Sequence, residues 1–128
     1  MYRVHVMKIR IKRVYEAALP TDGLRVLIDR LWPRGLKKED AAIDIWATHL
    51  APSSELRKWF GHDEERFDEF ARRYRVELGG ATGAIDELIA SAKGETITLV
   101  YGAKNTKHNN AVVLQALLQR HLKDVETS

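Results

Sequence analysis

The chain contains no cysteine. This absence excludes disulfide bonds, a Cys-based zinc site and a thiol nucleophile. No run of 18 or more apolar residues occurs, and the first residues lack the apolar segment of a secretory signal, so we expect no membrane partner and a cytoplasmic location. With 128 residues and 45% hydrophobic content, we predict one domain over residues 1–128, with a loose tail at 124–128.

Several sequence patterns of known chemistry are also missing. The five histidines, at positions 5, 49, 62, 108 and 121, form neither an HxxxH nor an HExxH pattern. No GxGxxG or GxxxxGK[ST] phosphate loop occurs, and no serine lies in a nucleophile-elbow pattern. We therefore predict no metal site and no cofactor, and we do not expect a common dinucleotide fold or a serine triad.

Positive charge is concentrated in the first third of the chain. Residues 1–40 contain ten Lys or Arg against five Asp or Glu, whereas residues 41–128 contain eleven against thirteen. A basic face of this kind could attract nucleic acid or a phosphorylated ligand. Lys8, Arg10 and Lys12 alternate with apolar residues, however, so the solvated face of a half-buried strand is the simpler interpretation.

Three segments have the pattern of strands. Apolar and polar residues alternate near 6–14, and apolar runs at 24–29 and 96–101 indicate buried strands. Helical patterns separate these strands. We therefore predict an α/β fold, a small layered sandwich whose at least partly parallel sheet is flanked by helices. If the two buried strands are parallel neighbours, the loops that follow them open at the same edge of the sheet.

Apolar residues spaced three and four apart predict helices in the rest of the chain. The expected ranges are 41–49, from 53 or 54 to 60, 63–78, from 82 or 83 to 92, and from 109 or 110 onward. We expect Gly61 to end the second of these helices. Trp46 is assigned to the core because it shares this spacing with Ile43 and Leu50.

The apolar run 24–29 leads directly into the segment Arg30-Leu31-Trp32-Pro33-Arg34-Gly35. Arg30 and Arg34 place two guanidinium groups, which suit phosphate or carboxylate, in a loop at the end of a strand. An ion pair with a nearby acid is an equally good role for Arg30. Trp32 either packs in the core or a lid, or offers a stacking surface to a flat ligand.

A second polar loop, residues 102–110, follows the run 96–101 and precedes the last helix. Lys104 could bind phosphate or, if desolvated, act as a base. His108, near the amino terminus of a helix, should favour its neutral form, which suits proton transfer. These two residues are our catalytic candidates, and Asn109 either orients the ligand or caps the helix. The alternative is a solvated Lys104 and a His108 that caps or packs.

A third segment of interest is Leu56-Arg57-Lys58-Trp59-Phe60-Gly61-His62-Asp63. In a functional interpretation, Arg57 contacts an anion and His62 reaches into a pocket as a general acid or base. In a structural interpretation, the segment is a helix stop after which Asp63 caps the next helix.

Three motifs in these segments are specific in combination. They are Asp29-Arg30-Leu31-Trp32-Pro33-Arg34-Gly35, Lys58-Trp59-Phe60-Gly61-His62, and Ala103-Lys104 with His108-Asn109. On these motifs, and over about Met7 to His121, the chain resembles a compact, YeaO-like member of the bacterial domain-of-unknown-function 488 (DUF488) family. The resemblance implies little chemistry. Larger relatives carry Cys-His-Arg at the start of the last helix, where this chain has His108-Asn109-Asn110.

Two functions fit these observations. The first is an enzyme, a transferase or hydrolase without metal or thiol chemistry, whose basic pocket at the carboxyl edge of the sheet takes a small anionic, phosphorylated or nucleotide-like substrate. Its ligand-binding candidates are Arg30, Trp32, Arg34, Arg57, His62 and Asn109, and its catalytic candidates are Lys104 and His108. The second is a non-catalytic module that binds nucleic acid or a nucleotide through the basic amino-terminal face, which would make binding strongly salt-dependent.

Overall fold

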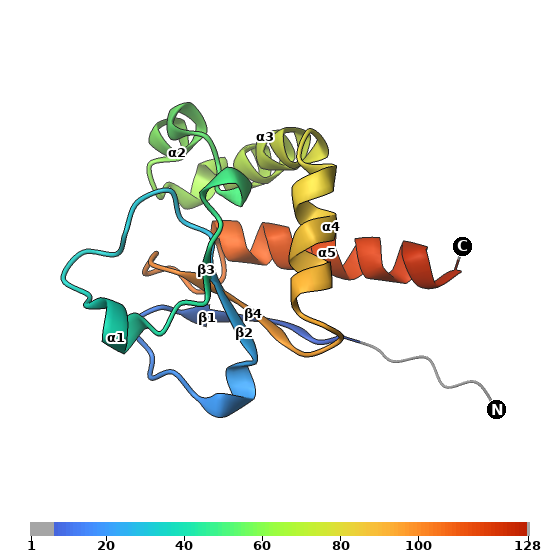
Figure 1. The fold of residues 1–128 in the computed structure, drawn as a ribbon. Coiled ribbons are helices and arrows are strands. Elements are labelled where there is room, and N and C mark those ends of the chain that lie inside the picture. Colours follow the sequence, from blue (N-terminus) through green and yellow to red (C-terminus); the bar gives the residue numbers. More distant parts are fainter. Residues whose placement is uncertain (1–6, 128) are drawn as a thin grey trace.

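The computed structural model describes the backbone of residues 7–127 and the side chains of residues 7–124. Within these limits four strands form one sheet: β1 (Ile9–Arg13), β2 (Leu24–Leu27), β3 (Ile45–Trp46) and β4 (Ile97–Tyr101). Their spatial order is β1-β4-β2-β3, and each neighbouring pair is parallel (Figure 1). The predicted, at least partly parallel sheet is therefore confirmed, and the two buried runs are parallel neighbours. Residue 6, where the first strand was expected to start, lies outside the described residues.

Five helices lie within the described chain: α1 (Lys38–Ala41), α2 (Ser54–Phe60), α3 (Phe67–Gly79), α4 (Thr82–Ser91) and α5 (Asn110–Thr127). Short 3-10 turns cover Pro20–Asp22, Thr48–Leu50 and Glu64–Arg66. Together with the parallel sheet, these helices confirm the predicted α/β sandwich. The backbone of α5 is helical through Thr127, and residue 128 lies outside the described residues, so the loose tail at 124–128 stays a prediction.

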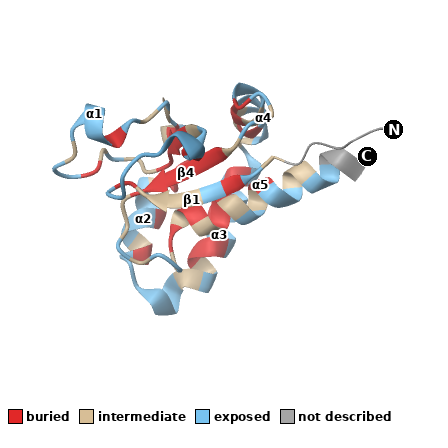
Figure 2. Cartoon of the chain, turned by 90° about the horizontal axis from the view of Figure 1, so that it is seen from below, coloured by how far each residue is buried: buried red, intermediate tan, exposed pale blue. Residues whose placement is uncertain are grey.

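The two faces of the sheet pack against layers of different size. Leu99 of β4 belongs to the main core, which also takes side chains from α2, α3, α4 and α5. Its neighbour Val100 faces the other way, into a small cluster with Val14 and Ala41 that Trp32 helps to cover. This alternation is expected because successive side chains of a strand point to opposite faces. β4 is buried along its whole length (Figure 2).

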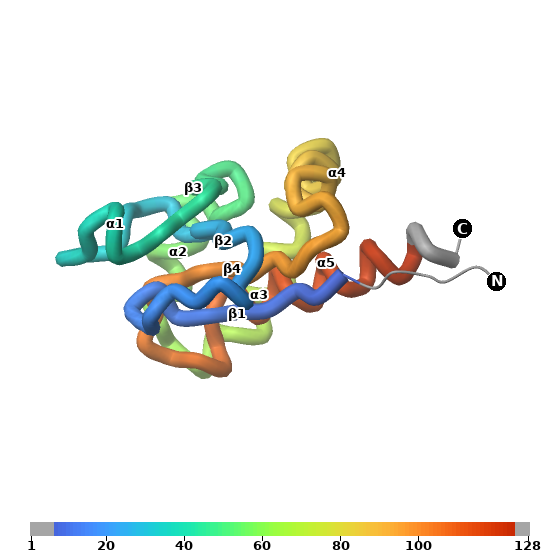
Figure 3. The backbone as a smooth tube through the Cα atoms, turned by 60° about the horizontal axis from the view of Figure 1, so that its bottom comes forward, coloured from blue at the N-terminus to red at the C-terminus, as the bar shows by residue number. Residues whose placement is uncertain are grey.

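The loops that follow β2 and β4 lie at one end of the molecule. The start of β1 and the end of α5 lie at the opposite end (Figure 3). α5 packs along β1 and β4, and it begins close to the carboxyl ends of the strands. This edge therefore gathers residues from distant parts of the chain.

The ends of α2 and the start of the segment before α3 follow the predicted capping chemistry. Ser53 Oγ accepts a hydrogen bond from the backbone N–H of Leu56 at 3.1 Å, which caps α2. Gly61 ends the helix with a left-handed backbone, at a φ of 53°. Asp63 Oδ1 then accepts from the backbone N–H of Glu65 at 3.0 Å. The structural interpretation of this segment is thus confirmed for its helix boundaries.

The helix predicted at 41–49 is wrong. This region contains the short strand β3, in which Ile45 pairs with Val26 of β2. The apolar spacing was ambiguous because a short apolar run fits both a strand and a helix, and the free edge of β2 decides between them. Trp46 is also not a core residue: it is 43% exposed, and its indole N–H donates to the carbonyl oxygen of Asp29 at 2.8 Å.

A buried ion pair secures the start of β2. Arg25 Nη1 lies 2.6 Å from Asp22 Oδ2, and both residues are 3% exposed. Arg25 also donates to the carbonyl oxygens of Ala41 and Ala42, and Lys12 Nζ lies 3.2 Å from Asp22. Burial alone would raise the pKa of Asp22, but hydrogen bonds from the Leu19 backbone, Lys12 and Arg25 outweigh it and lower that pKa.

Candidate functional site

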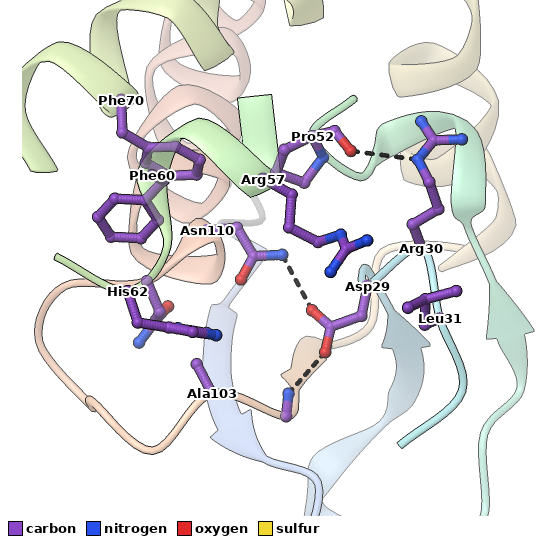
Figure 4. Close-up of a pocket in the computed structure, with 12 residues that line it drawn as sticks. Asp29, Arg30, Leu31, Pro52, Arg57, Phe60, His62, Phe70, Ala103 and Asn110 are labelled. Atoms are coloured by element: carbon purple, nitrogen blue, oxygen red, sulfur yellow. Dashed lines mark hydrogen bonds between the residues drawn. The ribbon is translucent and has the colours of Figure 1, made fainter. Parts of the chain in front are cut away.

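A pocket of about 230 Å³ lies at the carboxyl edge of the sheet, where β2 and β4 end (Figure 4). The segments that follow the strands contribute Asp29, Arg30, Leu31, Pro52, Gly102 and Ala103. The helices and their ends contribute Arg57, Phe60, His62, Phe70, Asn109 and Asn110. Ligands of open α/β sheets commonly bind at this edge, so the pocket is the candidate functional site.

Part of the pocket lining is apolar. The rings of Phe60 and Phe70 stack with their centroids 4.3 Å apart, and Leu31 and Pro52 add aliphatic surface. Phe60 and Phe70 are themselves part of the main core, which fixes their positions. A ligand in the pocket would therefore meet apolar surface from these residues as well as the polar and charged groups described below.

The carboxylate of Asp29 joins the ends of β2 and β4. Its Oδ2 accepts from the backbone N–H of Gly102 at 2.8 Å, and its Oδ1 accepts from Asn110 Nδ2 at 3.1 Å (Figure 4). A Cβ at position 102 would come within 3.0 Å of Asp29 Oδ2, so glycine allows this close approach. Burial raises the pKa of Asp29, although the hydrogen bonds from Asn110 and Gly102 and the charges of His62 and Arg57 oppose the increase.

The two asparagines at the start of α5 hold the loop and the helix together. Asn109 is 1% exposed; its Oδ1 accepts from the backbone N–H of Val112 at 3.0 Å, and its Nδ2 donates to the Asn105 carbonyl at 2.8 Å. Asn109 is therefore the helix cap that the sequence suggested, and its side chain is engaged within the protein although it lines the pocket. Asn110 Nδ2 also donates to the carbonyl oxygen of Ile28 at 3.0 Å, so it fixes the end of β2.

Arg57 extends from the last turn of α2 toward the cavity (Figure 4). Within the described chain, its guanidinium group makes no hydrogen bond and no ion pair. Its charge acts on Asp29 through space only. A guanidinium group with five N–H donors is thus left to solvent or to a ligand.

His62 lines the same cavity from the turn after α2. Its backbone has a φ of 58°, in the left-handed region that non-glycine residues rarely adopt. For such a residue this conformation costs about 1 kcal/mol. The ring of His62 is exposed and extends toward the cavity (Figure 4). A strained histidine at the rim of a pocket is the kind of feature that accompanies functional sites.

Arg30 lines the pocket but is partly used by the fold. Its Nε donates to the carbonyl oxygen of Pro52 at 3.3 Å, which ties the loop after β2 to the segment before α2. Among the described residues it forms no ion pair with Asp29 or another acid. The other N–H groups of its guanidinium group make no hydrogen bond within the described chain.

Two of the predicted binding residues lie away from the pocket lining. Trp32 donates from Nε1 to the Leu36 carbonyl at 2.7 Å and covers the small cluster on the other face of the sheet. Arg34 is exposed, and its backbone carbonyl accepts from the hydroxyl of Tyr15 at 2.9 Å. Of the arginines in this loop, the structure therefore brings only Arg30 to the pocket.

The catalytic candidates Lys104 and His108 also lie outside the pocket lining. Lys104 is exposed on the loop after β4. His108 contacts the ring of Phe67 edge-on, with the centroids 5.0 Å apart. Its Nδ1 is buried without a hydrogen bond and lies 3.7 Å from Glu64 Oε1. We expected Arg30, Arg34, Lys104 and His108 to converge on one site. Of these four residues, Arg30 lines the cavity and the other three do not.

The basic amino-terminal strand is partly neutralised. Lys8 and Arg10 are exposed, but Lys12 pairs with the buried carboxylate of Asp22. The alternation of these residues with Ile9 and Ile11 is that of an edge strand with one solvated side. Among the residues that the structure describes, no group of three or more His, Cys, Asp or Glu could hold a metal ion. No described helix has the length and apolarity needed to cross a membrane.

Together, the fold and the pocket define a small α/β protein with a parallel sheet and a mixed polar and apolar cavity at its carboxyl edge. Residues 8–128 match the family described as "Inactive DUF488-N3 subclade". The chain therefore belongs to the DUF488 family, as its motifs suggested.

The relatives of the chain are uncharacterised. It is 45% identical over 108 residues to the uncharacterized protein YeaO of Escherichia coli K12, which covers 84% of this chain and 94% of the relative. It is 44% identical over 115 residues to the uncharacterized protein Rv3073c of Mycobacterium tuberculosis H37Rv and to Mb3100c of Mycobacterium bovis, covering 90% of this chain and 97% of each relative. No solved structure gives a significant match.

Proposed function

We propose that this protein binds a small anionic ligand in the pocket at the carboxyl edge of its sheet. The observation that carries the proposal is the guanidinium group of Arg57, which borders the cavity without a hydrogen bond or ion pair in the described chain. His62 and Arg30 border the same cavity. A bidentate contact between a guanidinium group and a phosphate or carboxylate is a strong charge-assisted interaction.

Binding without turnover is the form of this function that we favour. The family that the chain matches is described as an inactive subclade. Lys104 and His108, the catalytic candidates, do not line the cavity. Asn109 is engaged in capping α5. The ligand would thus be held by Arg57, His62 and Arg30 and recognised rather than transformed.

An enzyme is the second candidate, and one observation favours it. Burial raises the pKa of Asp29, which lies in the cavity together with His62. Titratable groups with shifted pKa values in a pocket are candidates for proton transfer. In this case Asp29 and His62 would exchange protons with a bound transferase or hydrolase substrate. Mass spectrometry of each bound ligand after incubation with the protein would distinguish an enzyme, which forms a product, from a protein that binds without turnover.

The nucleic-acid alternative is weaker because two of the four cations at positions 8–13 are engaged within the fold. Lys12 pairs with Asp22, and Arg13 Nε donates to the carbonyl oxygen of Ala103. Binding through the basic strand would require oligonucleotides and would weaken steeply with salt. It would also be indifferent to changes in the pocket.

A thermal-shift and calorimetric screen tests the proposal. The probes are inorganic phosphate, sugar phosphates, mononucleotides and short oligonucleotides, since a ligand that prefers the native state raises the melting temperature. We expect a small anion to bind, and Arg57→Ala to weaken it about tenfold or more. Arg75→Ala removes the same charge from an exposed position of α3 outside the pocket and serves as the control. Retention of full affinity by Arg57→Ala would contradict the proposal.

A further inference from the structure

Two opposite charges share the pocket without touching. The carboxylate of Asp29 and the guanidinium of Arg57 both line the cavity and attract each other through space. Although both residues are described, no nitrogen of Arg57 approaches an oxygen of Asp29 within the 4.0 Å of an ion pair. Figure 4 shows the two groups facing the same space. A ligand placed between them could offer an anionic group to Arg57 and a hydrogen-bond donor to Asp29.

The carboxylate of Asp29 has acceptor capacity left for such a donor. An ionised carboxylate offers about four acceptor positions on its two oxygens. The backbone N–H of Gly102 uses one position on Oδ2, and the side chain of Asn110 uses one on Oδ1. One position therefore remains on each oxygen. Two adjacent hydroxyl groups match this pair of acceptors, and α/β folds that bind dinucleotides use a carboxylate in the same way to hold ribose hydroxyls.

Neutral hydroxyl groups suit the site better than an ammonium group. The charges of Arg57 and His62 already act on Asp29, and Arg30 lines the same cavity. An additional positive charge would be repelled by these groups, whereas a hydroxyl group would not. The hydroxyl-bearing carbon skeleton could then pack against Phe60 and Leu31.

The volume of the cavity limits the size of the ligand. Pockets for drug-sized ligands are about 300–1,000 Å³. A volume of about 230 Å³ is smaller and suits one sugar ring with one anionic group. A dinucleotide would extend far into solvent.

We propose that the ligand is a small phosphate ester with vicinal hydroxyl groups, of the ribose phosphate class, with its phosphate on Arg57 and its diol on Asp29. This inference rests on the proposed anion-binding function and names the class of ligand. Asp29 then acts as the specificity-determining residue, a role that is separate from the contact with the anion.

Isothermal titration calorimetry with three probes tests the inference. The probes are ribose 5-phosphate, 2-deoxyribose 5-phosphate, which lacks the vicinal diol, and inorganic phosphate. We expect ribose 5-phosphate to bind about tenfold more tightly than the deoxy sugar, because one charge-assisted hydrogen bond is lost. If the two sugar phosphates bind equally and Arg57→Ala abolishes both, the diol inference fails while anion binding stands. If none of the three probes binds, the diol inference fails, and the wider anion screen described above decides whether the proposed function fails with it.

A pair of variants assigns the preference to Asp29. In Asp29→Asn, the ratio of the two sugar-phosphate affinities should fall to about one, while the affinity for inorganic phosphate stays the same or increases. Asp44→Asn is the matched control, because Asp44 also accepts a backbone N–H, that of Arg25 at 2.8 Å, but lies outside the pocket lining. It should keep the preference. A preference that survives Asp29→Asn would overturn the assignment, and the wild-type comparison decides the diol inference if that variant does not fold.

Discussion

Asp22 lies just before strand β2 and Asp29 lies just after it. The two carboxylates differ in their charged partners. Asp22 is buried with Arg25 at 2.6 Å and Lys12 at 3.2 Å, so its charge is neutralised within the fold. Asp29 shares a cavity with Arg57 but does not pair with it, and its own hydrogen bonds come from uncharged donors, Gly102 and Asn110.

The difference shows how one strand can serve two purposes. At its amino end, charges are matched to hold the turn, the sheet and α1 together. At its carboxyl end, Asp29 and Arg57 line one cavity without forming an ion pair in the described chain. Charges that stabilise a fold are usually paired and hydrogen-bonded, whereas unpaired charges in a cavity are candidates for ligand contacts.

The largest expected effect comes from breaking the paired end. Arg25→Ala leaves the carboxylate of Asp22 buried with Lys12 as its remaining charged partner and removes the donors to Ala41 and Ala42. We expect the free energy of unfolding in urea to fall by about 3–5 kcal/mol. The exposed Arg75→Ala should change it by less than about 0.5 kcal/mol. A loss below about 1 kcal/mol at Arg25 would mean that the network does not hold the amino end of β2.

The next largest effect is expected in the pH dependence of stability, to which the two aspartates should contribute with opposite signs. The pKa of Asp29 is raised above its ordinary 3.8, so its contribution to stability is fully present below that pH and is lost as the pH rises through its folded-state pKa. The pKa of Asp22 is lowered, so its contribution is present above pH 3.8 and is lost as the pH falls through its folded-state value.

Urea unfolding of the wild type and Asp29→Asn at a series of pH values measures this. The free energy of unfolding of the wild type relative to the variant should decrease as the pH rises above 3.8. Asp44→Asn provides the comparison for loss of a carboxylate that accepts a backbone N–H. A wild-type advantage that grows with pH would show that the sign of the Asp29 shift is wrong.

A smaller effect is expected from relieving the strain at His62. Glycine adopts the left-handed backbone without penalty, so His62→Gly should raise the free energy of unfolding by up to about 1 kcal/mol while weakening binding of the anion. Lys93→Gly relieves similar strain, at a φ of 51°, away from the pocket lining. It should stabilise the protein and leave binding intact. Equal binding by both glycine variants would remove His62 from the site.

The smallest change in stability is expected for Arg57→Ala. Because Arg57 makes no hydrogen bond or ion pair in the described chain, its loss should alter the free energy of unfolding by less than about 0.5 kcal/mol. Chemical denaturation measures this, and the same sample should lose its response to the anion. A large destabilisation would instead make Arg57 a structural residue, and charges would then stabilise the fold at both ends of β2.

Much of the fold could be predicted from the sequence because its signals are local. The buried runs gave β2 and β4, and apolar spacing with Ser53 and Gly61 as boundaries gave α2. The helix predicted at 41–49 was wrong because the apolar residues there fit the period of a strand as well as that of a helix. Pairing with β2 makes part of this region the strand β3. The same tertiary pairing left Trp46 exposed.

The candidate site was predictable in part. The sequence pointed to the loops after two parallel strands and to Arg30, Arg57 and His62, all of which line the cavity. It did not identify Asp29 as a pocket residue, although a carboxylate directly after a buried strand was a visible signal.

The sequence by itself determined the family, the α/β class and the edge of the sheet where polar loops gather, because these depend on motifs and on the periods of strands and helices. Only the tertiary structure decided which charges pair. The side chains of Asp22 and Asp29 are chemically identical, but the fold brings Arg25 into contact with the first and leaves the second without an ion pair to Arg57 in the described chain. Electrostatic interactions depend on distance and burial, and neither can be read from the order of residues along a chain.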